Sequence, residues 1–358
     1  MTLAMIGSGL MGGGIALDAA RHGLDVLIYD ARPDGLPRLK ERAAGVYARW
    51  AKNGRMTSEA ADAALTRLLP APTLAEVGKA DIVIEAVFED LSVKRAVFAE
   101  LAPHLGADTV VATNTSALRV AALAEGFDFA DRVLGLHYFS PAEVCPLVEV
   151  VRAARTGDAA ITGAMNFLTA TRRTALACAD TPGFAINRFF CPYYNEATRI
   201  AADGLATPEQ IDLVARERLG VAAGPFTVLN LIGPRVAGHA MANLGPLGPF
   251  YAVTPALIAK GKAGGLYDVA EGASLPATAD AVEDRLLAAI AIPALELLAE
   301  RVADPQETDR GAVMALKFKQ GPYALMGGYP LARLEAAVAS LCARDGHKAP
   351  LIALPAAA

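Results

Sequence analysis

A glycine-rich turn near the start of the chain restricts the fold more than any other feature. The motif Gly-Ser-Gly-Leu-Met-Gly occupies residues 7–12, after the apolar run Leu3–Ile6 and before a helical pattern. Gly7 allows a tight turn, Gly9 lets a pyrophosphate approach the backbone, and Gly12 lets the helix pack on the strand. The helix N-terminus also offers free N–H groups to phosphates. The motif predicts a dinucleotide site that uses Gly7, Gly9, Leu10, Met11 and Gly12.

An acidic residue at the end of the second expected strand supports this interpretation. Asp30 follows the run Asp25–Tyr29, 18 residues after Gly12. A carboxylate at this place accepts hydrogen bonds from both hydroxyls of an adenosine ribose and repels a 2′-phosphate. The motif and the acid together predict NAD rather than NADP, with Arg32 the one nearby feature that could tolerate NADP. A glycine turn without the acid would fit a purely structural role equally well.

Short β-branched runs alternate with helical stretches in the first half of the chain. The expected strands are Leu3–Ile6, Asp25–Tyr29, Ile82–Ala86, Thr109–Ala112, Val133–His137, Leu147–Val151 and Thr174–Cys178. Helical patterns include Ile15–Arg21 and Ser92–Leu101. This alternation predicts an α/β Rossmann-like, doubly wound sheet with helices on both faces. Strand-like runs nearly disappear after residue 181, so we expect an NAD-binding domain at 1–181 followed by an all-α region.

The helical region contains an internal repeat. Residues Ile200–Phe226 match Leu297–Tyr323 at an offset of 97, including N-cap residues, an acid and a Gly-Pro-aromatic triplet. Agreement of these features at one offset favours duplication over a chance likeness of alanine-rich helices. We therefore expect a first helical domain at 182–281 and a second, degenerate one at 282–358. The two should pack together within the chain, and the second should lack an equivalent of Asn187-Arg188 and serve only as structure.

Charge and composition narrow the possible partners and location. The net charge of −5 and the pI of about 5.6 give no general reason to expect nucleic-acid binding. No apolar run approaches the roughly 20 residues of a membrane helix, and we expect no membrane partner and a cytoplasmic location. Four scattered cysteines without a CxxC pair indicate core residues of a reducing compartment, with neither disulfides nor a metal site. They are Cys145, Cys178, Cys191 and Cys342.

A histidine and a glutamate suggest acid–base chemistry. His137 ends an expected strand, where ligand crevices form in open α/β sheets, and Glu149 lies in the apolar run Leu147–Val151. A buried carboxylate needs a partner, and a hairpin-like return would bring it to His137. A metal-free alcohol dehydrogenase requires such a base. On spacing alone, a structural histidine beside a glutamate at a sheet edge fits equally well.

Two neutral side chains offer further hydrogen-bond donors. Ser116 lies in Asn-Thr-Ser at the end of another expected strand, and Asn187 lies near the domain boundary. Without other signals, both would be interpreted as cap or turn residues.

The order of these motifs resembles the L-3-hydroxyacyl-CoA dehydrogenase family. The resemblance rests on GSGLMG, EAVFEDLSVK at 85–94, NTS at 114–116, HYFSP at 137–141, Glu149 and PGFAINR at 182–188. The tandem helical repeat resembles the dehydrogenase part of multifunctional fatty-acid oxidation enzymes, whose crotonase-type partner is absent from this sequence. The resemblance covers most of residues 1–235 and implies NAD-dependent, reversible oxidation of an L-3-hydroxyacyl-CoA to a 3-ketoacyl-CoA.

The resemblance also implies a role for each matching residue. It makes His137 the catalytic base and Glu149 its partner, while Ser116 bonds the reacting oxygen and Asn187 helps to hold the acyl group. Further cofactor contacts would involve Glu89 and Lys94 near the nicotinamide ribose, Asp30 at the adenosine ribose, and Asn114. Asn230 departs from the pattern, because an aspartate is commoner there.

The implied substrate leaves other questions open. Lys52 and Arg55 lie in the expected helical excursion of the first domain, where they would meet CoA phosphates or simply form a solvated basic face. The same catalytic set would also suit a dehydrogenase of a small free 3-hydroxy acid. A non-catalytic nucleotide-binding protein is a third possibility, although its expected loss of His137, Glu149 or Asn187 is not seen. The oligomeric state stays open.

Overall fold

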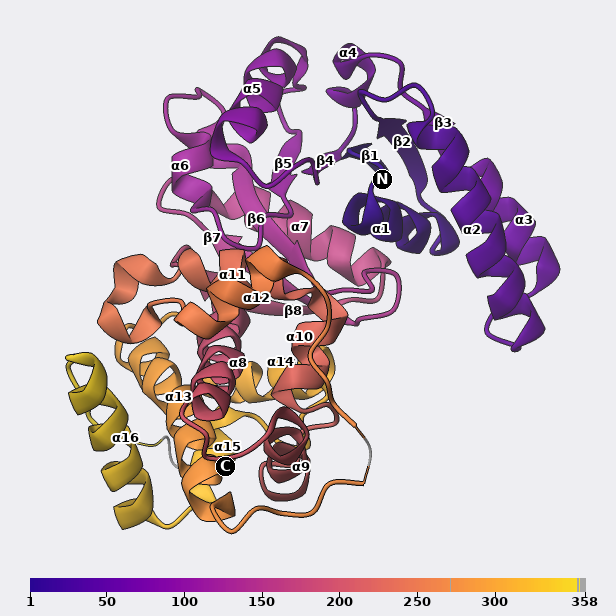
Figure 1. Ribbon diagram of the computed structural model, residues 1–358. Helices are drawn as coiled ribbons and strands as arrows, with labels where there is room; N and C mark the ends of the chain where they lie inside the picture. The colour runs from indigo at the N-terminus through magenta and orange to yellow at the C-terminus, as the bar shows by residue number, and fades with distance from the viewer. Residues whose placement is uncertain (271, 353, 355–358) are drawn as a thin grey trace. The chain divides into compact units, whose positions relative to one another are not determined.

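Eight strands in the first part of the chain form one sheet (Figure 1). Their order is β3-β2-β1-β4-β5-β6-β7-β8, and every neighbouring pair is parallel except the antiparallel pair β6 and β7. The strands are β1 Thr2–Ile6, β2 Asp25–Tyr29, β3 Leu68–Pro70, β4 Ile82–Glu85, β5 Val110–Thr113, β6 Val133–Tyr138, β7 Leu147–Arg152 and β8 Thr174–Ala179. This sheet confirms the predicted Rossmann-like class.

The computed structural model describes residues 1–270, 272–352 and 354. The chain divides between Asp180 and Thr181 into two compact units, one residue before the boundary expected from the sequence. Helices of the first unit are α1 Leu10–Arg21, α2 Gly35–Lys52, α3 Ser58–Thr66, α4 Leu74–Val77, α5 Leu91–Leu101, α6 Val120–Ala124 and α7 Asp158–Ala170, with short 3-10 turns at Ala102–His104 and Ala130–Arg132.

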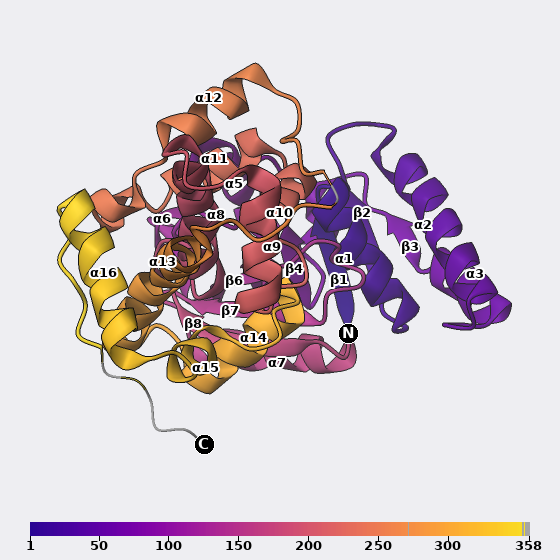
Figure 2. The ribbon, with the colours of Figure 1, turned by 60° about the horizontal axis from the view of Figure 1, so that its bottom comes forward.

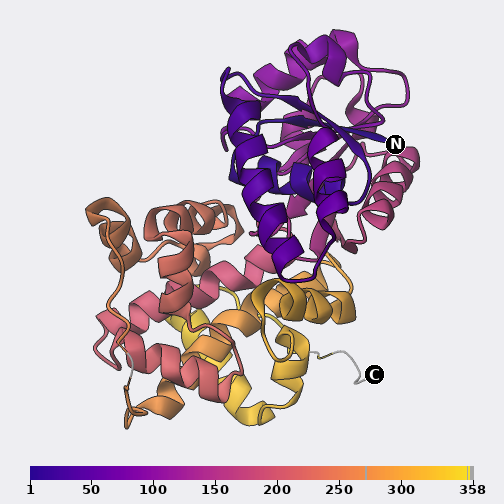
Figure 3. The same cartoon turned by 90° about the vertical axis from the view of Figure 1, so that its right-hand side faces the viewer.

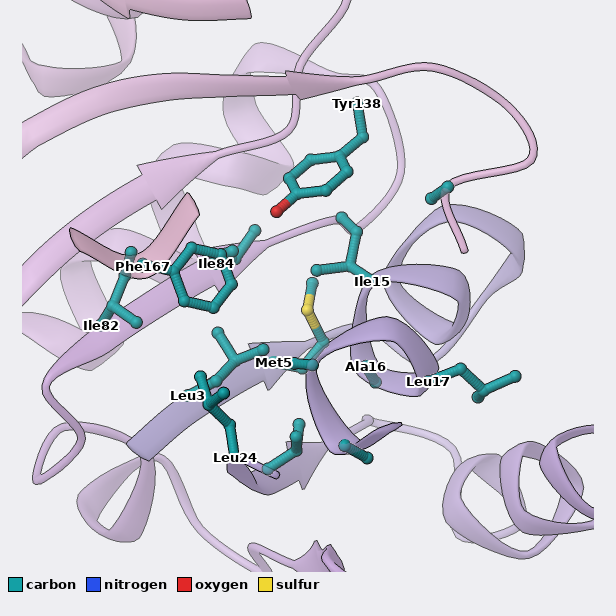
Figure 4. Packing of buried hydrophobic residues seen from close by; sticks show 14 of the residues in the cluster. Leu3, Met5, Ile15, Ala16, Leu17, Leu24, Ile82, Ile84, Tyr138 and Phe167 are labelled. Atoms are coloured by element: carbon teal, nitrogen blue, oxygen red, sulfur yellow. The ribbon is translucent and has the colours of Figure 1, made fainter. Parts of the chain in front are cut away.

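Alternate residues of the central strands face opposite sides of the sheet. Leu3 and Met5 belong to a large core cluster that includes residues of α1, α2, α3 and α7. In Figure 4 the Met5 side chain lies between the strands and helix α1. Ala4 and Ile6 belong to a second cluster with residues of α4 and α5. Burial on both faces explains why these strands are apolar throughout their length.

One strand was not expected from the sequence. β3 spans only three residues, Leu68–Pro70, and pairs with β2 at the edge of the sheet. It has no β-branched residue and follows directly on the helical pattern of α3, so no strand signal marks it. The seven expected strands are present. Asp25–Tyr29 has the expected bounds, and in the other strands no end is shifted by more than one residue.

The second unit is built from helices, as the ribbon from pink to yellow shows (Figure 2 and Figure 3). They are α8 Ile186–Ala202, α9 Pro208–Arg218, α10 Pro225–Ile232, α11 Pro234–Ala242, α12 Pro255–Ala263, α13 Ala279–Ala299, α14 Pro305–Leu316, α15 Pro322–Gly327 and α16 Leu331–Asp345, with 3-10 turns at Gly245–Leu247 and Pro249–Tyr251. Helices α8 and α13 lie side by side at its centre (Figure 1). The predicted all-α region is thus confirmed.

Positions separated by 97 residues meet each other in this unit. Val221 and Phe318 form an isolated antiparallel bridge. The N–H of Ala222 donates to the Lys317 carbonyl at 3.3 Å, and the N–H of Lys319 donates to the Gly220 carbonyl at 2.9 Å. The two bonds are equivalent under the offset of 97: the donor Ala222 corresponds to Lys319, and the acceptor Lys317 corresponds to Gly220. Such reciprocity is the mark of a two-fold relation and supports the expected pairing of two related copies within the chain.

The central helices carry a second reciprocal pair. Arg188 near the start of α8 donates to Glu300, the C-cap of α13, at 2.7 Å. Arg285 of α13 donates to Asp203, the C-cap of α8, at 2.6 Å. The offset of 97 relates both partners. The expectation that the second copy lacks an Asn-Arg equivalent is therefore wrong for the arginine, and only Asn187 is replaced, by Asp284.

Each copy also caps a helix in the same way. Asp212 accepts the N–H groups of Phe226 and Thr227 at the start of α10, and Asp309 accepts those of Tyr323 and Ala324 at the start of α15. Burial raises the pKa of both carboxyl groups, while these N–H donors oppose the rise. The adjoining glycine of the Gly-Pro-aromatic triplet provides the space that this cap needs.

The capping chemistry before α9 and α14 is less alike than the sequence suggested. Thr207 and Gln210 form a reciprocal capping box at α9, in which each side chain accepts a backbone N–H of the other's residue. Asp304 caps α14 through the N–H groups of Gln306 and Glu307. The Glu307 side chain pairs with Arg310, because a charged neighbour one turn on competes for its carboxylate.

The departure at Asn230 has a structural reason. Its amide donates to the Tyr267 carbonyl at 3.0 Å and accepts the Tyr267 N–H at 2.7 Å. A carboxylate cannot donate, so an aspartate would lose one of these two bonds. Asn230 thereby fastens the segment before α13 to helix α10.

Two other expectations concern the whole chain. All four cysteines are buried, as predicted for core residues. None of the helices within the described residues is long and apolar enough to cross a membrane.

The glycines of the two caps give a paired test of the repeat. A Cβ at Gly224 would lie 2.3 Å from Asp212 Cγ, and one at Gly321 would lie 2.1 Å from Asp309 Cα. We expect Gly224→Ala and Gly321→Ala each to lower the free energy of unfolding by about 1–3 kcal/mol, because the cap has no room for a methyl group. Gly327→Ala is the control, since its Cβ would meet nothing within 4 Å. Urea denaturation measures all three, and a cap variant as stable as the control would contradict the prediction.

Candidate active site

The glycine turn after β1 has the geometry that its sequence predicted. Gly7 has a φ of +95° and its N–H donates to the Tyr29 carbonyl at 2.8 Å. A Cβ at Gly12 would lie 2.0 Å from the Gly7 carbonyl oxygen. Only glycine at position 12 therefore lets the first turn of helix α1 pack this closely on the loop. A Cβ at Gly9 would meet nothing within 4 Å, which leaves this backbone open to a phosphate. The turn thus fits a bound pyrophosphate.

Two predicted cofactor residues stand at the start of α1. Leu10 is its first residue and is 68% exposed, and its carbonyl accepts Arg42 Nη1 at 2.9 Å. Met11 is partly buried against the core cluster. Cofactor contacts of either residue would therefore come through backbone N–H groups at the helix N-terminus.

Asp30 is held in place beside the glycine turn. One carboxylate oxygen accepts the Ser8 N–H at 2.8 Å and the Ser8 hydroxyl at 2.5 Å, and the other accepts Arg32 Nε at 3.1 Å. Burial opposes ionisation of Asp30, but hydrogen bonds from Arg32 and Ser8 outweigh it and hold the pKa of this carboxyl well below its usual range. The charge predicted to exclude a 2′-phosphate is therefore permanent at neutral pH, and Arg32 is paired with it.

A buried lysine links two acidic residues near the ends of β4 and β5. Lys94 Nζ lies 2.7 Å from Glu85 and 3.2 Å from Glu89, with the Lys94 and Glu85 side chains almost fully buried. Glu85 also accepts the Thr113 hydroxyl at 2.8 Å and the Val87 N–H at 2.6 Å. The structure therefore brings the predicted pair Glu89 and Lys94 together and adds Glu85 as its anchor.

Glu89 connects this pair to the segment that follows β5. It accepts the Thr115 hydroxyl at 2.5 Å and the Ser116 N–H at 2.9 Å. Asn114 accepts the Tyr138 N–H at 2.9 Å, which ties the ends of β5 and β6. Ser116 and Asn114 are thus fixed at the carboxyl ends of parallel strands, where ligands bind in open α/β sheets.

His137 and Glu149 meet across the antiparallel pair β6 and β7. They are register partners, and His137 Nδ1 lies 2.6 Å from a Glu149 carboxylate oxygen. Glu149 is fully buried and His137 is 5% exposed. The ring of Phe139 lies 4.6 Å from that of His137. The predicted hairpin contact is confirmed, while the catalytic role of the pair stays a prediction.

The remaining predicted site residues lie elsewhere. Asn187 belongs to the second unit, near the start of α8 and next to the buried Arg188. Lys52 is exposed at the end of α2. Arg55 instead lines a cavity of about 580 Å³ in the first unit, together with Arg172, Trp50 and other residues. Of the two residues expected to bind CoA, Arg55 lines this cavity and Lys52 does not.

That cavity is lined by three arginines, the Trp50 ring and one carboxylate, Glu143, which pairs with Arg42 at 2.9 Å. Arg55 and Arg172 make no ion pair among the described residues, and Arg21 lies 5.1 Å over the ring of Trp50. Burial lowers the pKa of His22 at its wall. The arginines are therefore its source of positive charge at neutral pH.

Sequence reasoning missed Glu85, Thr113 and Thr115. Glu85 stands at the start of the motif that included Glu89 and Lys94, but its role depends on helix α5 returning Lys94 to the end of β4. The available signal was a glutamate in an apolar strand, the same signal that identified Glu149. The two threonines carry no pattern of their own.

Comparison with known proteins places these features in a family. Residues 2–181 match the model "3-hydroxyacyl-CoA dehydrogenase, NAD binding domain", and residues 183–265 match "3-hydroxyacyl-CoA dehydrogenase, C-terminal domain". The chain is similar to 3-hydroxyadipyl-CoA dehydrogenase of Escherichia coli K12, with 40% identity over 238 residues, 66% of this chain and 50% of that protein. It is also similar to the fatty acid oxidation complex subunit alpha of Pseudomonas aeruginosa LESB58, with 32% identity over 66% of this chain and 33% of that protein.

A solved structure resembles nearly the whole chain. It is 3-hydroxybutyryl-CoA dehydrogenase from Escherichia coli K12, with a TM-score of 0.87 and 26% identity, covering 97% of this chain and 95% of that one. The two sequence relatives are longer, and this chain spans half of one and a third of the other.

The buried lysine gives a testable energetic prediction. Lys94→Met would leave Glu85 buried without its cation, and we expect a loss of about 3–5 kcal/mol in the free energy of unfolding. The double variant Glu85→Gln with Lys94→Met should recover most of that loss, because no buried charge remains. Lys79→Met, at an exposed lysine, is the matched control and should change stability by less than about 0.5 kcal/mol. Urea denaturation decides, and a double variant as unstable as the single one would contradict the pairing.

Proposed function

Because the chain belongs to the 3-hydroxyacyl-CoA dehydrogenase family, we propose that it interconverts an L-3-hydroxyacyl-CoA and its 3-ketoacyl-CoA, with NAD as the redox partner. The observation that carries the proposal is the buried His137–Glu149 pair at 2.6 Å, at the carboxyl end of β6 in the NAD-binding unit. This contact gives a metal-free alcohol oxidation the base that it needs.

The pair fixes which nitrogen of His137 does the chemistry. With Nδ1–H donating to Glu149, the lone pair of the neutral ring lies on Nε2. Nε2 then takes the proton of the substrate 3-hydroxyl, and the buried Glu149 carboxylate stabilises the imidazolium that results. In the reverse direction the imidazolium returns the proton to the carbonyl oxygen. NAD, when bound, supplies the hydride acceptor.

Neutral donors hold the reacting group in this scheme. The Ser116 hydroxyl bonds the reacting oxygen, and its main chain is fixed by the N–H bond to Glu89. Asn187 holds the acyl carbonyl through its amide. Both donors bind oxygen without competing with His137 for the proton.

The cofactor is held by the glycine turn, Asp30 and the carboxyl end of the sheet. Gly7, Gly9, Leu10, Met11 and Gly12 present the backbone to the pyrophosphate, and Asp30 accepts the adenosine ribose hydroxyls. Glu89 faces the nicotinamide ribose, with Lys94 acting through Glu89 because it is itself almost fully buried. Asn114 completes this side of the pocket.

For the CoA arm we propose the cavity that contains Arg55. Arg55 and Arg172, which form no ion pair within the described part of the chain, meet phosphate groups, and Trp50 offers a ring face to the adenine. Lys52, which does not line the cavity, contributes only long-range charge.

His137→Gln tests the general base. The glutamine amide can still donate to Glu149 but cannot accept a proton at neutral pH, so kcat should fall by about 10²–10⁴-fold. The affinity for NADH, measured by fluorescence titration, should stay within about twofold. Retention of more than about a tenth of kcat would sink the assignment of His137.

Asp30→Ala tests cofactor choice. Loss of a charged hydrogen-bond acceptor should weaken NAD binding roughly tenfold to a hundredfold. It also releases Arg32 from its ion pair, so binding of NADP should strengthen. Asp34→Ala is the control, because it removes a nearby surface carboxylate whose ion pair is with Arg38 and leaves the bonds of Asp30 to Ser8 and Arg32 in place. Titration with both cofactors measures the ratio, and an unchanged preference would show that another group makes the choice.

A further inference from the structure

The second helical copy contains a closed counterpart of the region around Asn187. The offset of 97 relates Asn187, Ile232 and Val236 to Asp284, Tyr329 and Arg333. The mapping rests on the reciprocal ion pairs and bridge bonds of the two copies. It also keeps the local geometry, since α11 begins at Pro234 and α16 begins at Leu331.

In the second copy these three side chains bind one another. The Tyr329 hydroxyl donates to Asp284 at 2.5 Å, and Arg333 Nε lies 2.6 Å from the same carboxylate. The Arg333 guanidinium also lies 5.1 Å over the Tyr329 ring. A phenol, a guanidinium and a carboxylate therefore fill the corner between α13, α15 and α16.

The first copy has aliphatic side chains at the corresponding corner. Ile232 is 40% exposed and Val236 is 59% exposed, and the preceding Leu231 is 77% exposed. Neither Ile232 nor Val236 can donate, accept or carry charge. Helix α8 packs on α10 and α11 as α13 packs on α15 and α16. The repeat therefore assigns Ile232 and Val236 the places relative to Asn187 that Tyr329 and Arg333 have relative to Asp284.

We propose that Ile232 and Val236 form the wall of the subsite for the acyl chain and set the preference for chain length. This inference rests on the proposed function, in which Asn187 holds the acyl carbonyl. An aliphatic wall near that carbonyl receives the methylenes that lie beyond carbon 3, and each methylene buried there raises kcat/KM by up to about fourfold. The expected substrate therefore carries an unbranched apolar acyl chain. In the second copy the polar contacts among Asp284, Tyr329 and Arg333 replace this aliphatic wall, so that copy offers no acyl subsite.

The experiment measures kcat/KM of the full chain with NADH and 3-ketoacyl-CoA thioesters of four, six and eight carbons. Ile232→Tyr with Val236→Arg introduces the side chains of the closed corner and should lower kcat/KM for eight carbons by about tenfold more than for four. Affinity for NADH should not change. Val236→Ala, a smaller change, should flatten the dependence on chain length in a protein that folds normally.

The equivalent corner supplies the matched control. Tyr329→Ile with Arg333→Val makes the opposite exchange in the second copy and should leave the chain-length profile unchanged, whatever it does to thermal stability. An unchanged profile in both first-copy variants would overturn the inference, as would an equal change in the control. A higher kcat/KM of the unaltered chain for a thioester ending in a carboxylate would do the same. Failure of the unaltered chain with every thioester would instead overturn the proposed function itself.

Discussion

Glu149 is a fully buried carboxylate in the middle of an apolar strand, and the arrangement of the candidate site depends on how it is paired. A buried charge without a partner is unfavourable by several kcal/mol. The antiparallel register of β6 and β7 solves this by placing His137 directly opposite. A shift of one residue in that register would turn Glu149 and His137 to opposite faces. The chemistry of the site and the stability of the sheet therefore require the same alignment.

The same constraint operates at the neighbouring strand end. Glu85 is buried at the end of β4 and is satisfied by Lys94, Thr113 and the Val87 N–H. Lys94 in turn reaches Glu89, which orders the segment that carries Ser116. Two buried carboxylates, one on β4 and one on β7, thus position Lys94, Glu89, the Ser116 segment and His137.

Features local to the sequence were predictable, and features made by distant contacts were not. Asp30 and the glycine turn follow from strand-turn-helix spacing, and the contact of Glu149 with His137 follows from a carboxylate in an apolar run. Strand β3 was not predicted, because three residues without β-branching give no periodic signal. The anchoring role of Glu85 depends on a tertiary contact, which a single sequence does not display. The equivalence of Arg285 with Arg188 could have been predicted by extending the offset of 97 beyond the matched stretch.

The proposed function requires that this chain acts on a CoA thioester and uses His137 as the base. The most direct measurement compares NADH oxidation by the full chain with acetoacetyl-CoA and with free acetoacetate under identical conditions. We expect a kcat/KM for the thioester that is roughly a hundredfold higher or more, equivalent to at least about 2.7 kcal/mol of binding to the CoA arm in the transition state. An equal or higher kcat/KM with the free acid would contradict it.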